Sequence, residues 1–253
     1  MSYLIINGGK KLHGEIVNQS SKNSALAILC ACLMIKGKTA LLDVPRIEEI
    51  DRMLELLTNL GVVIIRQGRV MIVDTSKKIN TAKIDKQTVS TMRSSLFLLG
   101  ALAGREKSYK LYKSGGCHLG ERTVRPHIYA LEKLGVKIKI QADYYDVRNG
   151  ELKANEIVMY ESGDTATENV IMAAVLAKGK TVIKMASANY MAQDLCYFLN
   201  SAGARISGIG TTTLMIEGVK FLKATRYAIM PDPIVAMTFL SVGITTGSEL
   251  TIK

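Results

Sequence analysis

A single cysteine among glycines is the stretch of this chain best suited to chemistry. Gly115 and Gly116 precede Cys117, and Gly120 follows it. Glycine adopts backbone conformations that other residues rarely reach, so the pattern predicts a mobile loop or an anion-cradling turn. Basic side chains follow within a few residues, namely Arg122, Arg125 and His127. A thiol beside cations has a lowered pKa and becomes reactive. A surface turn whose cysteine happens to lie among basic residues would show the same pattern, and both interpretations stay open on these residues alone.

A lysine near the start of the chain is the second candidate. The polar residues 18–24 precede an apolar segment at 25–35, and Ser20, Ser21 or Asn23 could cap the helix that this segment predicts. Lys22 therefore lies at or near a helix N-terminus, where free backbone N–H groups and the helix dipole favour an anion. The alternative is an exposed lysine in a loop.

Composition limits the class of protein. The chain has 253 residues, of which 48% are hydrophobic, enough for one large domain or two small ones. The longest apolar run, 25–35, is too short to span a bilayer, and the first residues lack the pattern of a secretory signal. Four cysteines are too few for a disulfide scaffold, and Cys30 and Cys32 lack the spacing and histidine partners of a zinc site. We therefore expect a cytoplasmic protein with no membrane partner and no bound metal.

The net charge of +11 raises the question of an anionic partner. Lysine and arginine are spread along the chain, and no basic run is interleaved with aromatic residues. Small phosphorylated or carboxylated ligands are thus favoured over nucleic acid, which we do not expect as a partner. A generally solvated basic surface is the alternative.

The chain repeats itself with a period of roughly 70 residues. Gly61, Gly135 and Gly203 each end an amphipathic segment and begin a strand. The predicted helices are 25–35, 47–60, 94–103, 124–134, 167–177 and 191–202. The predicted strands are 39–42, 62–66, 69–73, 109–112, 136–140, 144–147, 181–185, 204–207 and 213–217. A hairpin of strands 3–7 and 12–17 is expected before the repeats, and a fourth copy begins with a helix at 234–244 and a strand at 249–252.

Several stretches, taken together and in order, resemble the enolpyruvyl transferase family over essentially the whole chain. The matches include Lys22-Asn23, Met92-Arg93-Ser94, the glycine-rich loop from Gly115 to Arg122, Ala166 to Asn169, and Pro231-Asp232. The resemblance implies an α/β fold with two lobes, each an inside-out α/β barrel of three βαβαββ units, and an active site between them. We expect residues 22–229 to form one complete lobe that carries the Cys117 loop. Residues 1–21 and 230–253 would then be a fragment of the other, incomplete lobe.

The resemblance also implies an activity. It is the transfer of the enolpyruvyl group from phosphoenolpyruvate to the 3′-hydroxyl of UDP-N-acetylglucosamine in peptidoglycan synthesis, with no metal or organic cofactor. Cys117 matches the loop thiol that donates a proton and that fosfomycin alkylates. The residues matching those that hold phosphoenolpyruvate are Lys22, Arg93 and Arg122, and Lys22 is also counted as catalytic. Those expected on the sugar-nucleotide side are Asn23, Arg122, Thr123, Val124, Arg125, His127, Ser162 and Gly163.

The chemistry needs these residue types. Phosphoenolpyruvate carries about three negative charges near neutral pH, and guanidinium groups match carboxylate and phosphate oxygens. The addition step also needs an acid that protonates the vinyl carbon, and a closing loop places that acid while it excludes water.

The sequence departs from the family pattern on the nucleotide side. Thr123-Val124-Arg125 stands where the family typically has Pro-Val-Asp, residues 161–166 are altered, and residues 188–191 replace an expected acidic pair. These departures motivate a second hypothesis, a truncated or non-catalytic paralogue that binds a nucleotide or phosphorylated ligand. Because the fourth repeat is incomplete at Lys253, we further expect that a C-terminal segment or partner chain completes the second lobe. The 253 residues alone are then expected not to catalyse the transfer reaction.

Cys117 should be the most reactive thiol of the native protein. It alone lies in a basic, glycine-flanked stretch, whereas Cys30, Cys32 and Cys196 lie in apolar predicted helices. Brief iodoacetamide treatment followed by mass mapping should find the label first on Cys117. Equal or preferential labelling of any other cysteine would count against this assignment.

Overall fold

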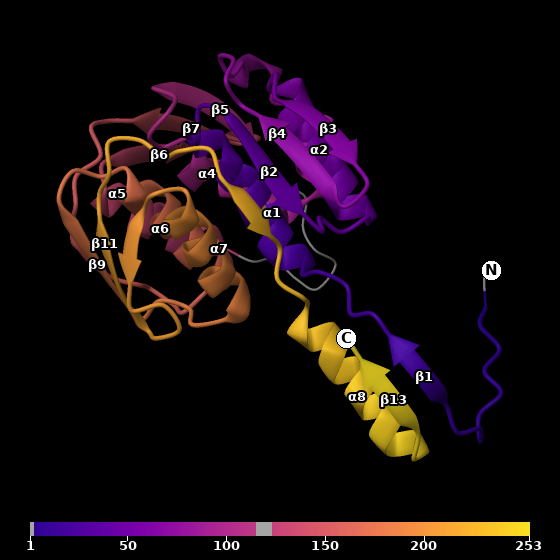
Figure 1. Ribbon diagram of the computed structural model, residues 1–253. Helices are drawn as coiled ribbons and strands as arrows, with labels where there is room; N and C mark the ends of the chain where they lie inside the picture. The colour runs from indigo at the N-terminus through magenta and orange to yellow at the C-terminus, as the bar shows by residue number, and fades with distance from the viewer. Residues whose placement is uncertain (1–2, 115–122) are drawn as a thin grey trace.

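The structure is a computed structural model, and it describes residues 3–114 and 123–253 (Figure 1). Most of these residues form one body in which three sheets surround a set of central helices. A smaller extension of α8, β1 and β13 projects from this body (Figure 1). The family's α/β arrangement, with helices inside and sheets outside, is therefore present.

The first repeat is closed by a strand from much later in the chain. Its sheet has the order β12-β2-β4-β3, and β12 pairs in parallel with β2 while the other pairs are antiparallel. The helices of this repeat are α1 (Lys22–Ala31), which continues into a 3-10 helix (Cys32–Met34), and α2 (Glu48–Asn59). The strands are β2 (Lys38–Leu42), β3 (Val63–Gln67), β4 (Val70–Asp74) and β12 (Arg226–Ala228).

The second repeat has an antiparallel sheet with the order β5-β7-β6. It opens with a 3-10 helix (Thr81–Lys83), α3 (Lys86–Thr91), a second 3-10 helix (Arg93–Phe97) and α4 (Leu98–Ala101). The remaining elements are β5 (Ser108–Tyr112), α5 (Arg125–Lys133), β6 (Val136–Ile140) and β7 (Tyr144–Asn149).

The third repeat shows the complete βαβαββ order. Its sheet runs β10-β11-β9-β8, in which β8 is parallel to β9 and the other pairs are antiparallel. The elements are β8 (Glu156–Val158), α6 (Asp164–Val175), β9 (Lys180–Lys184), α7 (Tyr190–Ser201), β10 (Arg205–Ser207) and β11 (Thr213–Glu217). The sequence predicted every helix and strand of this repeat except β8, although α6 begins three residues earlier than expected.

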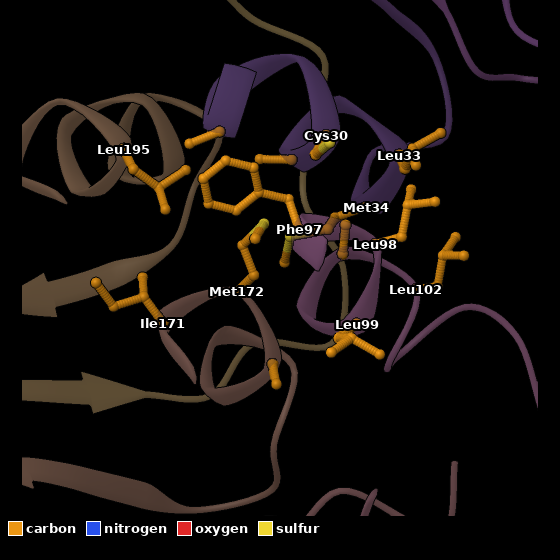
Figure 2. Close-up of a cluster of buried hydrophobic side chains, with 14 of the residues drawn as sticks. Cys30, Leu33, Met34, Phe97, Leu98, Leu99, Leu102, Ile171, Met172 and Leu195 are labelled. Atoms are coloured by element: carbon orange, nitrogen blue, oxygen red, sulfur yellow. The ribbon is translucent and has the colours of Figure 1, made fainter. Parts of the chain in front are cut away.

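The core lies between the central helices. Residues Ser24 to Ala31 of α1 and Ala166 to Val175 of α6 are buried without interruption. A helix surrounded by protein needs no continuous polar face, and the few polar residues of these segments, such as Glu168 and Asn169, are buried with the rest. Figure 2 shows Cys30, Phe97, Met172 and Leu195 meeting where α1, α4, α6 and α7 come together. This packing holds the helices of the three repeats in fixed positions.

The glycine landmarks of the repeat have one conformation. Gly61, Gly135 and Gly203 have φ angles of 95°, 102° and 99°. Each follows the end of a helix and precedes a strand, where the chain must reverse with a left-handed residue that glycine adopts without strain. The expected helix ends are therefore confirmed.

The predicted hairpin between residues 3–7 and 12–17 is wrong. Within the described residues, 3–7 form no strand, and their apolar side chains are exposed. The strand β1 (His13–Ile16) instead pairs in parallel with β13 (Glu249–Ile252) at the other end of the chain. A parallel pair needs a long connection, so no local turn signal could indicate it.

The extension carries an apolar helix. Asp232 caps α8 (Pro233–Thr246), which contacts β13 and has no buried residue among the positions described. Ile234, Met237 and Ile244 are 61%, 59% and 80% exposed. The two ends of the chain thus pair with each other and leave an apolar face open. None of the helices in the described ranges has the length and apolar character that a membrane span requires.

Gly100 is the position where the helix packing is least tolerant. A Cβ atom added to this residue of α4 would lie 2.4 Å from the backbone oxygen of Asn169 on α6. Gly100→Ala should therefore lower the free energy of unfolding by at least about 2 kcal/mol, because two buried helices must move apart. Gly8→Ala is the control, since nothing lies within 4 Å of its added Cβ. Denaturant unfolding checks this, and equal stability of the two variants would contradict it.

Candidate functional site

The N-terminal ends of several helices meet around one cleft of about 420 Å³. First-turn residues of α1, α2, α6 and α7 line it, together with the start of the 3-10 helix that precedes α4. The lining residues are Lys22, Asn23, Leu26, Glu49, Thr91, Met92, Arg93, Ser94, Phe97, Asp164, Thr165, Glu168 and Met191. Helix N-termini carry partial positive charge and unpaired N–H groups, so their convergence favours an anion in this cleft.

Polar side chains hold these helix ends in place. Ser21 caps α1, and its Oγ accepts a hydrogen bond of 3.2 Å from the backbone N–H of Ser24. Asp164 at the start of α6 accepts hydrogen bonds from Ser187 Oγ and from Asn189 Nδ2, the latter at 2.8 Å. Since Asn189 is the residue before α7, Asp164 joins the N-termini of two helices at the cleft.

A carboxylate positions the candidate lysine. Lys22 Nζ lies 2.8 Å from Glu49 Oε2, and Ser94 Oγ donates a 3.0 Å hydrogen bond to Glu49 Oε1. Both members of the ion pair are partly exposed, so it adds little to stability. Its consequence is geometric, because it holds the Lys22 ammonium across the cleft beside the segment that begins with Arg93.

Arg93 shares this cleft with Lys22, although the two are far apart in the sequence. Its guanidinium donates a 3.3 Å hydrogen bond to the backbone oxygen of Thr123. This contact brings the start of α5 next to the cleft. Cys117 and Arg122, which were predicted to complete the set, lie outside the described residues. Two of the three predicted phosphoenolpyruvate ligands are thus brought together, and their role stays a prediction.

The predicted sugar-nucleotide residues are spread over three places. Asn23 lines the cleft beside Lys22. Thr123, Val124 and Arg125 lead into α5, and Thr123 Oγ1 accepts a 3.1 Å hydrogen bond from the Arg125 backbone N–H. The third place is the start of α6. Ser162 is exposed there and donates a hydrogen bond to the backbone oxygen of Ala186, and Gly163 is the residue before the helix.

His127 lies on α5, is only 4% exposed and faces α6. Its Nδ1 lies 3.0 Å from Asn169 Nδ2, and Asn169 Oδ1 accepts a 2.7 Å bond from the Gly100 backbone N–H. A backbone N–H can only donate, so the amide oxygen faces Gly100 and the amide nitrogen donates to His127. Nδ1 is therefore an acceptor and the ring is neutral. Burial and the nearby Arg93 lower the pKa of His127 to about 4.

The three described cysteines, Cys30, Cys32 and Cys196, are buried. Burial raises the pKa of each thiol, that of Cys196 to about 12. A thiol that stays protonated is a poor nucleophile, so these three fit a structural role. In the part of the chain that the structure describes, no group of three or more histidine, cysteine, aspartate or glutamate side chains is arranged to hold a metal ion.

The comparison with known families decides the relationship. Residues 6–253 match the family described as EPSP synthase (3-phosphoshikimate 1-carboxyvinyltransferase). The chain belongs to the EPSP synthase family.

Curated relatives within this family share much of the sequence. UDP-N-acetylglucosamine 1-carboxyvinyltransferase 2 of Caldanaerobacter subterraneus subsp. tengcongensis is 42% identical over 98% of this chain and 59% of its own length. UDP-N-acetylglucosamine 1-carboxyvinyltransferase of Hydrogenovibrio crunogenus is 36% identical over 100% of this chain and 60% of its own. The chain therefore spans about 60% of the length of these relatives.

Solved structures give the same fold. The enolpyruvyl transferase NikO of Streptomyces tendae superposes with a TM-score of 0.81 at 21% identity, covering 94% of this chain and 56% of that one. EPSP synthase of Acinetobacter baumannii superposes with a TM-score of 0.76 at 16% identity, covering 94% of this chain and 54% of that one. The predicted enolpyruvyl transferase fold is confirmed.

Three acidic residues that line this cleft were not predicted as site residues. Glu49 and Asp164 lie in the first turns of α2 and α6, where an acidic residue is expected for helix stability alone. Glu168 lies one turn further along α6 and is buried. It stands in a stretch that matches the family, but the stretch alone gave no role to its carboxyl group.

The buried histidine makes stability depend on pH. His127 titrates near 4 in the folded protein and near 6.5 when unfolded, so over that interval the unfolded state binds more protons and stability falls as pH drops. Between pH 7 and pH 5, the wild type should lose about 2 kcal/mol more than His127→Gln, which keeps an acceptor but cannot titrate. Urea unfolding at the two pH values measures this. The other histidines and the carboxylates are common to both proteins, and parallel pH dependences would contradict the assignment.

Proposed function

We propose that this chain carries the phosphoenolpyruvate site of an enolpyruvyl transferase that acts on the 3′-hydroxyl of UDP-N-acetylglucosamine. The observation that supports this most is the convergence of four helix N-termini on a cleft that also holds Lys22 and Arg93. The curated relatives that the chain matches are named for that reaction. As part of the same proposal, the activity serves peptidoglycan synthesis and the protein acts in the cytoplasm.

Phosphoenolpyruvate fits the charges of this cleft. The Lys22 ammonium and the helix N-termini favour its phosphate and carboxylate, and the guanidinium of Arg93 matches either group with paired hydrogen bonds. The resemblance predicts Arg122 as a third cation for phosphoenolpyruvate. It precedes Thr123 in the sequence, and Arg93 contacts the Thr123 backbone. Asn23, beside Lys22, then faces the sugar nucleotide.

The reaction proceeds by addition and elimination. The 3′-oxygen of the sugar bonds to C2 of phosphoenolpyruvate as its hydroxyl proton leaves to a base, and the vinyl carbon takes a proton from the Cys117 thiol. In the tetrahedral ketal, the C2–O bond to phosphate then breaks as C3 loses a proton, which gives the enolpyruvyl ether and inorganic phosphate. The fixed cations stabilise the departing phosphate. The same thiol is the proposed target of fosfomycin, and no metal or organic cofactor takes part.

The proposal includes a division of the chain into lobes. Residues 22–229 form the complete lobe of three repeats, and residues 1–21 with 230–253 belong to the other lobe. The apolar face of α8 then packs against a further segment or a partner chain that completes this second lobe. Catalytic groups must be held on both sides of the cleft, so the 253 residues alone bind phosphoenolpyruvate but do not turn it over.

A phosphate-release assay tests the reaction. With phosphoenolpyruvate and UDP-N-acetylglucosamine present, the chain extended through its downstream reading frame should release phosphate, and the 253 residues alone should not. In the extended protein, Lys22→Ala should lower kcat/KM for phosphoenolpyruvate by at least tenfold, since one charged contact is worth about 1.5–3 kcal/mol. Lys223→Ala removes an exposed lysine as the control. Full activity of Lys22→Ala, or no phosphate release by the extended protein, would refute the proposal.

A further inference from the structure

One carboxyl group at the cleft has no counterpart in the family chemistry described above. Glu168 is 1% exposed and lines the same cleft as Lys22, Asn23 and Arg93. Its Oε1 is buried, and no hydrogen-bonding group in the described part of the chain reaches it. Buried polar atoms in folded proteins nearly always have a partner, so an unpaired oxygen beside a cleft points to a partner that the protein chain does not supply.

The surroundings of Glu168 determine its protonation state. The group is fully buried, and burial together with the nearby Asp164 raises its pKa well above the usual value for glutamate. Two thiols, Cys30 on α1 and Cys196 on α7, also lie close enough for the charge of Glu168 to affect them. Lys22 pairs with Glu49, and Arg93 donates a hydrogen bond to the backbone oxygen of Thr123. Both effects favour the protonated, uncharged form of Glu168 over the ionised form.

A neutral carboxylic acid can donate one hydrogen bond, which an ionised one cannot. At the floor of a cleft that binds an anion, this donor adds a short, strong O–H···O⁻ contact without adding charge. An ionised glutamate at the same place would repel the ligand. The unpaired oxygen and the converging helix N-termini are then two parts of one binding site.

We propose that Glu168 is a ligand-positioning residue whose carboxyl group donates a hydrogen bond to an anionic oxygen of phosphoenolpyruvate at the floor of the cleft. The proposal rests on the proposed function, because it takes phosphoenolpyruvate as the occupant of this cleft. It adds a neutral donor from α6 to the cations on α1 and before α4.

Two substitutions of Glu168 separate binding from structure. Glu168→Gln keeps the size and a hydrogen-bond donor, whereas Glu168→Leu keeps the approximate volume and removes every polar atom. Isothermal titration of each 253-residue protein with phosphoenolpyruvate gives the Kd, and thermal unfolding gives the Tm. We expect the Kd of Glu168→Gln within about threefold of the wild type and that of Glu168→Leu raised at least tenfold. The Tm of Glu168→Leu should be equal to or above that of the wild type, since an unpaired polar group is removed.

The outcomes distinguish this inference from the function on which it rests. If Glu168 were only a structural residue, Glu168→Leu would bind phosphoenolpyruvate as tightly as the wild type, and that result would overturn the inference alone. Equal loss of affinity in Glu168→Gln and Glu168→Leu would also overturn it, because the retained donor would then have no effect. A wild-type chain that binds no phosphoenolpyruvate would overturn both the inference and the proposed function. Lys22→Ala, titrated in parallel, shows that the heat observed comes from this cleft.

Discussion

The close packing of α6 against α4 and α5 at the centre of the main body fixes the position of the cleft. Gly100 on α4 approaches the backbone of Asn169 on α6 so closely that no side chain fits between them. The Asn169 amide group bonds to the Gly100 backbone and to His127 on α5, so one buried side chain ties three helices together. Because α6 cannot rotate or slide without breaking these buried hydrogen bonds, its N-terminus stays directed at the cleft.

Positive and negative groups both line that cleft, and most of the negative groups are already paired or hydrogen-bonded. Lys22 and Arg93 provide full positive charges, and the helix ends provide partial positive charge. Glu49, in the first turn of α2, forms an ion pair with Lys22. Asp164, in the first turn of α6, accepts a hydrogen bond from Asn189 at the start of α7. Burial and the nearby Asp164 raise the pKa of Glu168, which favours its uncharged form. An anion consequently meets a net attractive site even though three carboxyl groups line the cleft.

Local patterns predicted much of this structure. Gly61, Gly135 and Gly203 marked helix ends, and the period of the apolar residues located the helices of all three repeats. The pairing of β12 with β2, and of β1 with β13, joins segments that are distant in sequence, and no local signal specifies such partners. Residues 3–7 have the apolar pattern of a strand, but the pattern alone does not show whether a partner strand is present, and in the structure they form none. Lys22 was recognisable from the cap that precedes it. Glu168 was not, because its character comes from burial between helices, which the sequence shows only as an apolar stretch around one acidic residue.

A structure of this chain with bound phosphoenolpyruvate tests the central claim most directly, because it locates the anion independently of any rate. The account predicts the phosphate or carboxylate oxygens within hydrogen-bond distance of Lys22 Nζ and the Arg93 guanidinium, at the N-terminal ends of α1 and α6. Phosphoenolpyruvate bound at another place on the molecule, with this cleft unoccupied at saturating concentration, would contradict it.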